Sequence, residues 1–214
     1  RRRIAPAECS DVVTIRAARD SDTALYRAKE QGRDRVDVFD DRLRDQAVRR
    51  HSVEQQLRKA LDEDRLEAFY QPVIRIRDRR VTGAEALVRM RTEDGQILGP
   101  AVFIDVAEET GLINRVGAHV LTTATQRAAG WSSTPTEGGV ERVSISVNVS
   151  ARQLADAGFP NQVSQVLTDT GLHPEQLCLE LTESVLIDAN PITERVLAEL
   201  IDMICRYIFK EDPS

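Results

Sequence analysis

The chain has 214 residues, of which 41% are hydrophobic and 30% are charged, an ordinary balance for a soluble globular protein of one large or two small domains. Its formal net charge of -6 and its pI of about 5.2 argue against a nucleic-acid partner, since such partners usually require a basic excess on one face. No apolar stretch approaches the ~20 residues of a spanning helix, so we expect no membrane segment in this chain. Three cysteines, Cys9, Cys178 and Cys205, lack the spacing of zinc sites or disulfide frameworks, which favours a reduced, cytoplasmic protein.

The first 62 residues predict two short elements followed by one long helix. Apolar residues at helical spacing predict a helix over residues 21–31, ended by Gly32, and a short strand over residues 36–39. Residues 40–62 carry an apolar stripe and oppositely charged pairs four residues apart, which predicts a polar helix. Two interpretations of this helix stay open: a linker between two modules, and a solvated surface helix with no signalling role.

From residue 66 onward, predicted strands and helices alternate. The polar turn Arg77-Asp78-Arg79 joins the first two strands and favours an antiparallel hairpin. The later alternation favours βαβ units and a largely parallel sheet. The strands are predicted over residues 66–76, 79–90, 143–149 and 177–182, and the helices over residues 100–109 and 114–131, over a stretch ending near residue 170, and from Pro191 onward, with a Ser, Pro and Gly cluster breaking the chain at residues 132–139.

Length limits how much of a barrel these elements can form. A closed (β/α)₈ barrel takes ~250 residues, and ~200 at the least. Only about 160 residues follow residue 53, and four strands are predicted among them. We therefore expect an α/β fold that is an incomplete TIM-like barrel with one antiparallel strand, leaving strand edges unpaired.

Three acid or amide side chains lie on three separate predicted strands: Glu85, Asn148 and Glu180. A barrel of alternating strands and helices gathers such groups at one face. Carboxylate and amide oxygens are the ligands that Mg²⁺ and similar hard ions prefer, so these residues have the right atoms for half of a two-ion site. Taken alone, Glu85 would be an exposed acid at a strand end, and Asn148 a turn or cap residue.

A series of short motifs occupies the segment from residue 57 to residue 200. In chain order they are Tyr70-Gln71-Pro72, Glu85-Ala86-Leu87, Phe103-Ile104, Ala107-Glu108, Gly111-Leu112-Ile113, Ser146-Val147-Asn148-Val149-Ser150-Ala151-Arg152-Gln153-Leu154 and Glu180-Leu181-Thr182-Glu183-Ser184. Through their number and order, this segment resembles the EAL family of cyclic-di-GMP phosphodiesterases. A lone Glu-Ala-Leu would carry no weight, because common helix formers meet by chance.

A shorter set of residues, Asp20-Ser21-Asp22-Thr23-Ala24-Leu25-Tyr26-Arg27-Ala28-Lys29-Glu30-Gln31-Gly32-Arg33-Asp34-Arg35-Val36 with Phe39, resembles the last helix and strand of a GGDEF diguanylate cyclase domain. The Gly-Gly-Asp-Glu-Phe signature itself does not occur in the sequence. Together the two resemblances imply a GGDEF remnant over residues 1–39, a linker helix over 40–62, the N-terminal part of an EAL domain over 63–200, and a tail outside the family over 201–214.

The EAL resemblance implies roles for particular residues. That family folds as a modified eight-stranded barrel with one antiparallel strand and hydrolyses cyclic-di-GMP to linear pGpG with Mg²⁺ or Mn²⁺. By position, the metal ligands would be Glu85, Asn148 and Glu180; the substrate-binding residues would be Gln71, Leu87 and Arg89, with Arg89 at the phosphate; and Glu183 would order a nearby loop without binding metal.

The sequence departs from the family pattern after this point. The Asp-Asp-Phe-Gly segment, the lysine and the further glutamates that would hold a second ion have no counterpart, and Asp202 alone does not match them. We therefore expect one partial metal site at most and no meaningful hydrolysis.

Other functions stay open beside this one. The chain would be a receptor that binds cyclic-di-GMP weakly without catalysis, or a remnant that binds a partner or forms a homodimer through the linker helix or an open sheet edge, or a fragment that does not fold stably. The residues from 201 onward would either extend the last helix or be out-of-frame sequence.

Overall fold

The structure is a computed structural model, and it describes residues 17–18, 41–131, 134–136, 139–182 and 190–208. The helix predicted over residues 21–31, the strand over residues 36–39 and nearly all of the GGDEF-like segment lie outside these residues.

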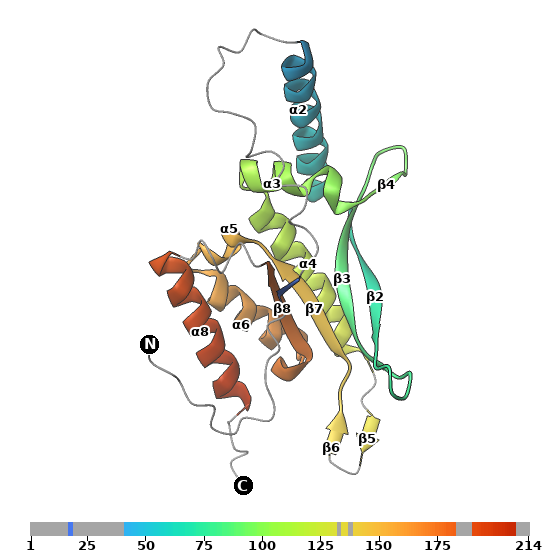
Figure 1. Cartoon of the computed structure of the whole chain (residues 1–214), viewed down its shortest axis with the longest axis vertical. Helices are drawn as coiled ribbons and strands as arrows, with labels where there is room; N and C mark the ends of the chain where they lie inside the picture. Colours follow the sequence, from blue (N-terminus) through green and yellow to red (C-terminus); the bar gives the residue numbers. More distant parts are fainter. Residues whose placement is uncertain (1–16, 19–40, 132–133, 137–138, 183–189, 209–214) are drawn as a thin grey trace.

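One mixed sheet forms the centre of the fold (Figure 1). The hairpin of β2 (Leu66–Ile74) and β3 (Val81–Arg91) is antiparallel, as the sequence predicts. β3 then pairs in parallel with β7 (Ser144–Val149), and β7 pairs in parallel with β8 (Leu177–Thr182). Two very short strands complete the sheet: β1 (Ala17–Ala18) beside β8, and β4 (Ile97–Leu98) beside β3. Among the described residues the strand order is β1-β8-β7-β3-β2 and does not close into a ring, consistent with a partial TIM-like barrel.

The helices predicted from residue 40 onward are confirmed, with two of them divided. They are α2 (Asp41–Asp62), η1 (Pro100–Val102), α3 (Ile104–Thr110), α4 (Ile113–Ala129), α5 (Ala151–Leu154), α6 (Phe159–Thr170), η2 (Pro174–Gln176) and α8 (Pro191–Ile208). The stretch predicted to end near residue 170 is two helices, because the chain turns between α5 and α6, where Asp156 accepts a hydrogen bond from the Gly158 amide. α8 continues without a break from residue 200 to Ile208.

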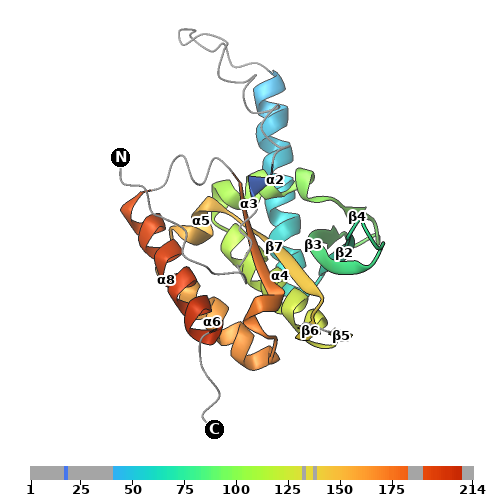
Figure 2. The same ribbon diagram turned by 60° about the horizontal axis from the view of Figure 1, so that its bottom comes forward.

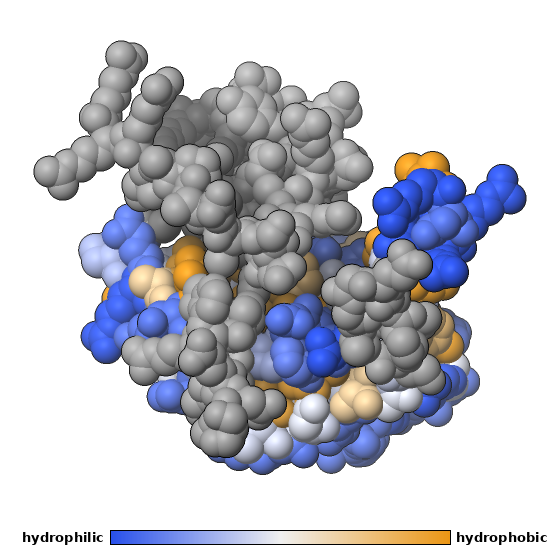
Figure 3. Space-filling view, turned by 90° about the horizontal axis from the view of Figure 1, so that it is seen from below, coloured by the Kyte–Doolittle hydropathy of each residue, from blue (hydrophilic) through white to orange (hydrophobic). Residues whose placement is uncertain are grey.

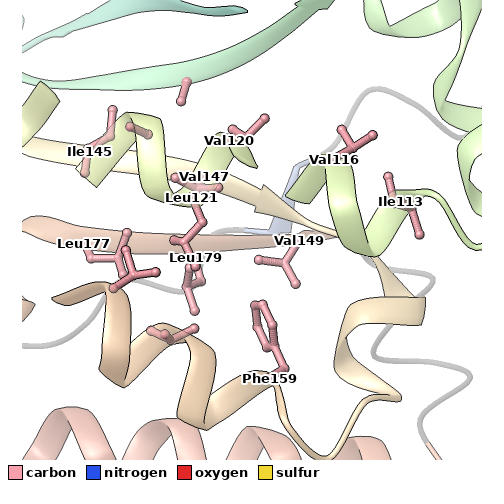
Figure 4. Packing of buried hydrophobic residues seen from close by; sticks show 14 of the residues in the cluster. Ile113, Val116, Val120, Leu121, Ile145, Val147, Val149, Phe159, Leu177 and Leu179 are labelled. Carbon is pink, nitrogen blue, oxygen red and sulfur yellow. The ribbon is translucent and has the colours of Figure 1, made fainter. Parts of the chain in front are cut away.

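The core lies between one face of the sheet and the helices that cover it. Figure 4 shows Val116, Val120 and Leu121 of α4 beside the aliphatic side chains of β7 and β8, with Phe159 of α6 below them. In Figure 2, α6 and α8 lie on the same side of the sheet. Apolar residues alternate with polar ones along β7, so only one of its faces is packed against helices.

The β2–β3 hairpin is attached to α4 at its base. His119 of α4 lies 3.0 Å, through Nε2, from the backbone oxygen of Leu66, so this histidine packs against the start of β2. Trp131, just after α4, meets the ring of Tyr70 edge-on, with ring centroids 6.1 Å apart. The far end of the hairpin extends away from the helices (Figure 1).

α2 buries apolar side chains through its second half, and its first half reaches α3 through an ion pair of 3.4 Å between Arg50 and Glu109. Leu57 and Ala60 are fully buried, whereas residues 45–52 are exposed and project beyond the sheet (Figures 1 and 2). The helix itself is confirmed, and its role as a linker between two modules stays a prediction. No helix in the described part of the chain has the length and apolar character needed to cross a membrane.

Four short strands were not predicted from the sequence, and β1 (Ala17–Ala18) is the first of them. β5 (Thr134–Thr136) and β6 (Gly139–Glu141) form a small antiparallel pair inside the cluster of Ser, Pro and Gly that was read as a break. β4 consists of two residues and pairs with the end of β3. Elements of two or three residues are too short to show an alternating pattern, so periodicity cannot find them.

Candidate functional site

The predicted site residues share one face of the sheet. On β3, Glu85, Leu87 and Arg89 alternate with Ala84, Ala86, Val88 and Met90, and the second set packs toward the helices. Because side chains alternate along a strand, the first three point to the opposite face, which none of the described helices covers. Asn148 and Glu180 lie on this face of β7 and β8 by the same alternation.

Strand register brings these residues close together. Gln71 on β2 is directly opposite Glu85 on β3, and Asn148 on β7 is directly opposite Glu180 on β8. Glu85 is opposite Ser146 on β7, and Asn148 lies two residues after Ser146, so its side chain is on the same face. Adjacent strands are ~4.8 Å apart, which places the four side chains along one row across four neighbouring strands.

A hydrogen bond links two of the predicted metal ligands. The Asn148 side-chain NH₂ donates to Glu85 Oε1 across 2.8 Å. This bond orients both side chains and leaves the Asn148 carbonyl oxygen and the second Glu85 oxygen for another partner. Glu180 adds a second carboxylate from the neighbouring strand.

By chemical type, Glu85, Asn148 and Glu180 are side chains that a divalent cation accepts as ligands. Two carboxylates and one amide carbonyl are hard oxygen ligands, and Mg²⁺ commonly takes one or two carboxylates and completes its shell with water. Among the described residues, His, Cys, Asp and Glu side chains do not form a group of three or more that could hold a metal ion. A set of three ligands therefore has to include the amide of Asn148. Asp202 lies on α8 and not on a strand beside β8, whereas Glu183 lies outside the described residues.

Arg89 has an aromatic neighbour that the sequence analysis missed. Its guanidinium carbon lies 5.5 Å from the centre of the Phe69 ring, a distance typical of a cation–π contact. Arg89 Nη1 also donates to the backbone oxygen of Val88 across 2.8 Å. Phe69 is 41% exposed and lies two residues before Gln71, so strand alternation from Gln71 would have placed it on this face.

A cavity of about 400 Å³ opens beside the ligand set, where β3 and β7 part. The two strands pair only along residues 83–86 of β3, after which β3 continues toward β4 and β7 ends at α5. Helices α3 and α4 close the resulting fork. Its walls are mainly aliphatic, and Leu87 and Asn148 connect it with the polar face; the lining also includes Ile104, Glu108, Ile113, Val116, Gly117, Val120, Ser150 and Gln153.

Glu108 is the ionisable group in the wall of this cavity. Burial raises the pKa of its carboxyl above the ordinary value of 4.5, and the nearby Asp105 carboxylate raises it further, while Arg152 partly offsets both effects. The sequence analysis used Glu108 only as part of a motif and assigned it no role.

Gln153 fixes the floor of the cavity. Its side-chain oxygen accepts from the Ser150 amide across 3.1 Å, and the Ser150 hydroxyl accepts from the Gln153 amide across 3.3 Å, which together form a capping box. The Gln153 side chain is buried against Gly117, where a Cβ atom would overlap its amide group. This contact holds the start of α5, directly after Asn148, against α4.

The chain matches the EAL domain family over residues 54–206, well over half of its length, and it belongs to that family. It is 35% identical over 196 residues to the cyclic di-GMP phosphodiesterase PdeR of Escherichia coli (strain K12), covering 92% of this chain and 28% of PdeR. It is 32% identical over 200 residues to the signaling protein YkoW of Bacillus subtilis (strain 168), covering 94% of this chain and 24% of YkoW.

Among solved structures, the c-di-GMP complex of PaMucR phosphodiesterase matches with a TM-score of 0.62 and 31% identity, over 73% of this chain and 60% of that chain. The chain therefore spans about a quarter of the length of the two curated relatives. It is an EAL-domain protein related to cyclic-di-GMP phosphodiesterases.

Proposed function

We propose that this chain carries the metal-ligand half of a cyclic-di-GMP site and takes part in signalling by that dinucleotide. The observation that supports this most directly is the hydrogen bond of 2.8 Å between Asn148 and Glu85, with Glu180 opposite Asn148 on the next parallel strand. These three side chains would hold one Mg²⁺ or Mn²⁺. Such an ion, when bound, supplies a positive charge that polarises a phosphodiester oxygen.

The remaining residues of the face would bind and orient the dinucleotide. Gln71 would donate from its amide beside Glu85, and Arg89 would pair with a phosphate, its guanidinium held in place by Phe69. Leu87 would contact the ligand at the mouth of the cavity. The placement of these side chains on adjacent strands favours binding of the dinucleotide, because a rigid sheet holds the binding groups at fixed separations.

Hydrolysis to linear pGpG requires more than this face offers. A hydroxide nucleophile is generated and positioned most effectively between two ions some ~3.5 to 4 Å apart, and each ion needs its own oxygen ligands. Glu85, Asn148 and Glu180 would supply the ligands of one ion, and the sequence lacks the Asp-Asp-Phe-Gly segment and the lysine expected after it. We infer that the 214 residues by themselves bind the dinucleotide weakly and do not hydrolyse it.

Binding is tested by titration calorimetry of the purified chain with cyclic-di-GMP, with and without Mg²⁺. We expect heat that depends on Mg²⁺, and about a tenfold loss of affinity in Asn148→Ala and in Arg89→Ser, since each removes one polar contact. Asn161→Ala, which truncates an exposed asparagine on α6, is the matched control and should bind normally. No heat at ~100 μM ligand, which limits binding to weaker than about −5 kcal/mol, would contradict the binding proposal.

Catalysis is tested separately, by following linear pGpG after incubation with Mn²⁺. We expect no product above the level of a Glu85→Gln variant. Turnover at the rate of a complete EAL phosphodiesterase would show that the ligand set is sufficient, and would contradict the inference of inactivity while leaving the binding proposal intact.

Three further parts of the proposal concern the rest of the chain. Residues 1–39 would be the end of a GGDEF domain, the protein would act in the cytoplasm, and two copies would pair through α2 or a sheet edge. The exposed residues 45–52 of α2 favour pairing through that helix. Analytical ultracentrifugation tests it, since a single species of monomer mass at all concentrations would contradict pairing.

A further inference from the structure

The tip of the β2–β3 hairpin, residues 74–81, differs from the rest of the surface. It lies at the end of the hairpin farthest from α2 and α3 (Figure 1), and Figure 3 shows hydrophobic atoms on a hydrophilic protrusion at this side of the molecule. Ile74, Ile76 and Val81 are 53%, 94% and 51% exposed. Single exposed aliphatic residues are common on proteins, but three at one protruding turn form a cluster.

The same turn concentrates positive charge. Its four arginines and one aspartate give a net charge of +3, in a chain whose formal net charge is -6. Arg75 forms an ion pair of 2.8 Å with Asp78, whereas Arg77 lies 3.9 Å from the same carboxylate and its side chain is 79% exposed. Arg79 and Arg80 supply the other two guanidinium groups. The tip therefore presents several cations around its aliphatic side chains.

Arg79 adopts a backbone conformation that suits glycine better than arginine. Its φ is 57°, in the left-handed region that side chains with a Cβ atom rarely occupy. Its amide donates to the Arg75 oxygen across 2.8 Å, which completes the turn. A strained position that carries a charged side chain points to a use for the side chain itself, because glycine would form the same turn without strain.

We propose that this tip is a contact site for the surface of a bilayer that contains anionic lipids. Ile76 and its aliphatic neighbours would enter the interface between headgroups and acyl chains, and Arg77, Arg79 and Arg80 would pair with the phosphate and carboxylate groups of the lipids. A spanning helix is not required for such a contact, and the described residues hold none. The site is independent of the cyclic-di-GMP function proposed above.

The shape of the tip favours a lipid surface over an acidic protein. Its most exposed aliphatic residue, Ile76, is at the apex of a narrow turn, and two cavities lined by described residues lie elsewhere, one near β4 and one in the fork between β3 and β7. A convex apex of this kind needs a matching groove on a protein, whereas the soft headgroup region of a bilayer admits it directly. The tip is at the start of β3, and Asn148 and Glu180 are near the ends of β7 and β8, so a docked chain would hold its ligand set away from the lipid.

The test is co-sedimentation of the whole chain with vesicles of phosphatidylcholine alone and of phosphatidylcholine with phosphatidylserine. We expect binding to the second kind only, and weaker binding as salt rises. Replacing Arg77, Arg79 and Arg80 by Gln should lower the partition coefficient by about fivefold for each arginine removed. Ile76→Ser should also lower it. Arg195→Gln and Ile192→Ser, which alter an exposed arginine and a half-exposed isoleucine on α8, are the matched controls and should bind as the unchanged chain does.

Arg79→Gly separates lipid contact from a structural role of the turn. This variant should melt about 2 to 4 °C higher, because it removes the strain of a left-handed residue, and yet bind anionic vesicles more weakly. Equal binding to neutral vesicles, or no binding at low salt, would overturn the proposal. So would binding of soluble polyglutamate by a chain that ignores vesicles, since the tip would then recognise an acidic polypeptide.

Discussion

On β7, Ile145, Val147 and Val149 point toward α4 and α6 and are buried, whereas Ser146 and Asn148 between them point to the opposite face and stay at least partly exposed. The first face is continuous, aliphatic and covered by helices. The second carries the carboxylates, the amide and the guanidinium of the candidate site. Because the two sets alternate within one strand, stability and chemistry are divided between neighbouring residues and should respond separately to substitution.

Ile145→Ala tests the buried face and should have the largest effect. The side chain is fully buried in the core, and truncation of such a residue costs about 2 to 5 kcal/mol of unfolding free energy. Urea denaturation followed by circular dichroism measures it. Ser146→Ala, one residue away on the other face, should change the same quantity by less than about 0.5 kcal/mol. Equal losses in the two variants would show that the faces do not differ as described.

Gly117→Ala tests the junction between the two faces. The new Cβ atom would overlap the Gln153 amide, so the capping box after Asn148 would have to move, at a cost of about 1 to 3 kcal/mol. The better helix propensity of Ala offsets about 1 kcal/mol of this. In the double variant Gly117→Ala/Gln153→Ala the overlap is gone, so the two substitutions should be strongly non-additive. Additive losses would mean that Gln153 is not what excludes a side chain at residue 117.

Asn148→Ala tests the open face and should have a smaller effect on stability. It removes one hydrogen bond at an exposed site, worth about 0.5 to 1 kcal/mol. Its effect on Mn²⁺ binding, followed by electron paramagnetic resonance of the free ion, should be much larger in proportion. A variant that unfolds but still binds Mn²⁺ as before would reverse the proposed division of tasks.

Glu108→Gln tests the half-buried wall of the cavity and should have the smallest effect. Burial raises the pKa of Glu108 in the folded chain, so the ionised carboxylate costs stability at neutral pH, and this cost disappears as pH falls through the folded-state pKa toward 4.5. The Gln variant should therefore melt slightly higher than the unchanged chain at pH 7, and the difference should close near pH 4.5. Melting curves across this range measure it. A difference that grows toward acid pH would mean that Glu108 is stabilised as an anion.

The long strands and helices, and the proximity of Glu85 to Asn148, can be predicted from the sequence for one physical reason. Both lie in strands of alternating pattern that are separated by helices, and parallel strands bring equivalent positions together at one face. Gly83 could not be read in the same way. Its close approach to Ser144 in the neighbouring strand appears only once the two backbones are in register.

Other parts of the site depend on contacts between distant segments, which periodicity does not report. Gln153 and Gly117 are far apart in sequence, and neither carries a local signal of the other. The fork between β3 and β7 has the same origin, because β3 is longer than its pairing with β7 and turns toward β4. β5 was missed for a different reason. The Ser, Pro and Gly residues around it are a local signal, but they favour a loop and not a strand.

The amide at residue 148 also affects the geometry of the candidate site in the absence of a ligand. A third carboxylate at this position would face Glu85 at hydrogen-bond distance, and two like charges so close would repel until a cation or a proton arrived. An amide can instead give its NH₂ to one neighbour and keep its oxygen available. Asparagine thereby lets Glu85 and residue 148 hold each other by a hydrogen bond without a cation, so that an arriving ion would find these two side chains already oriented.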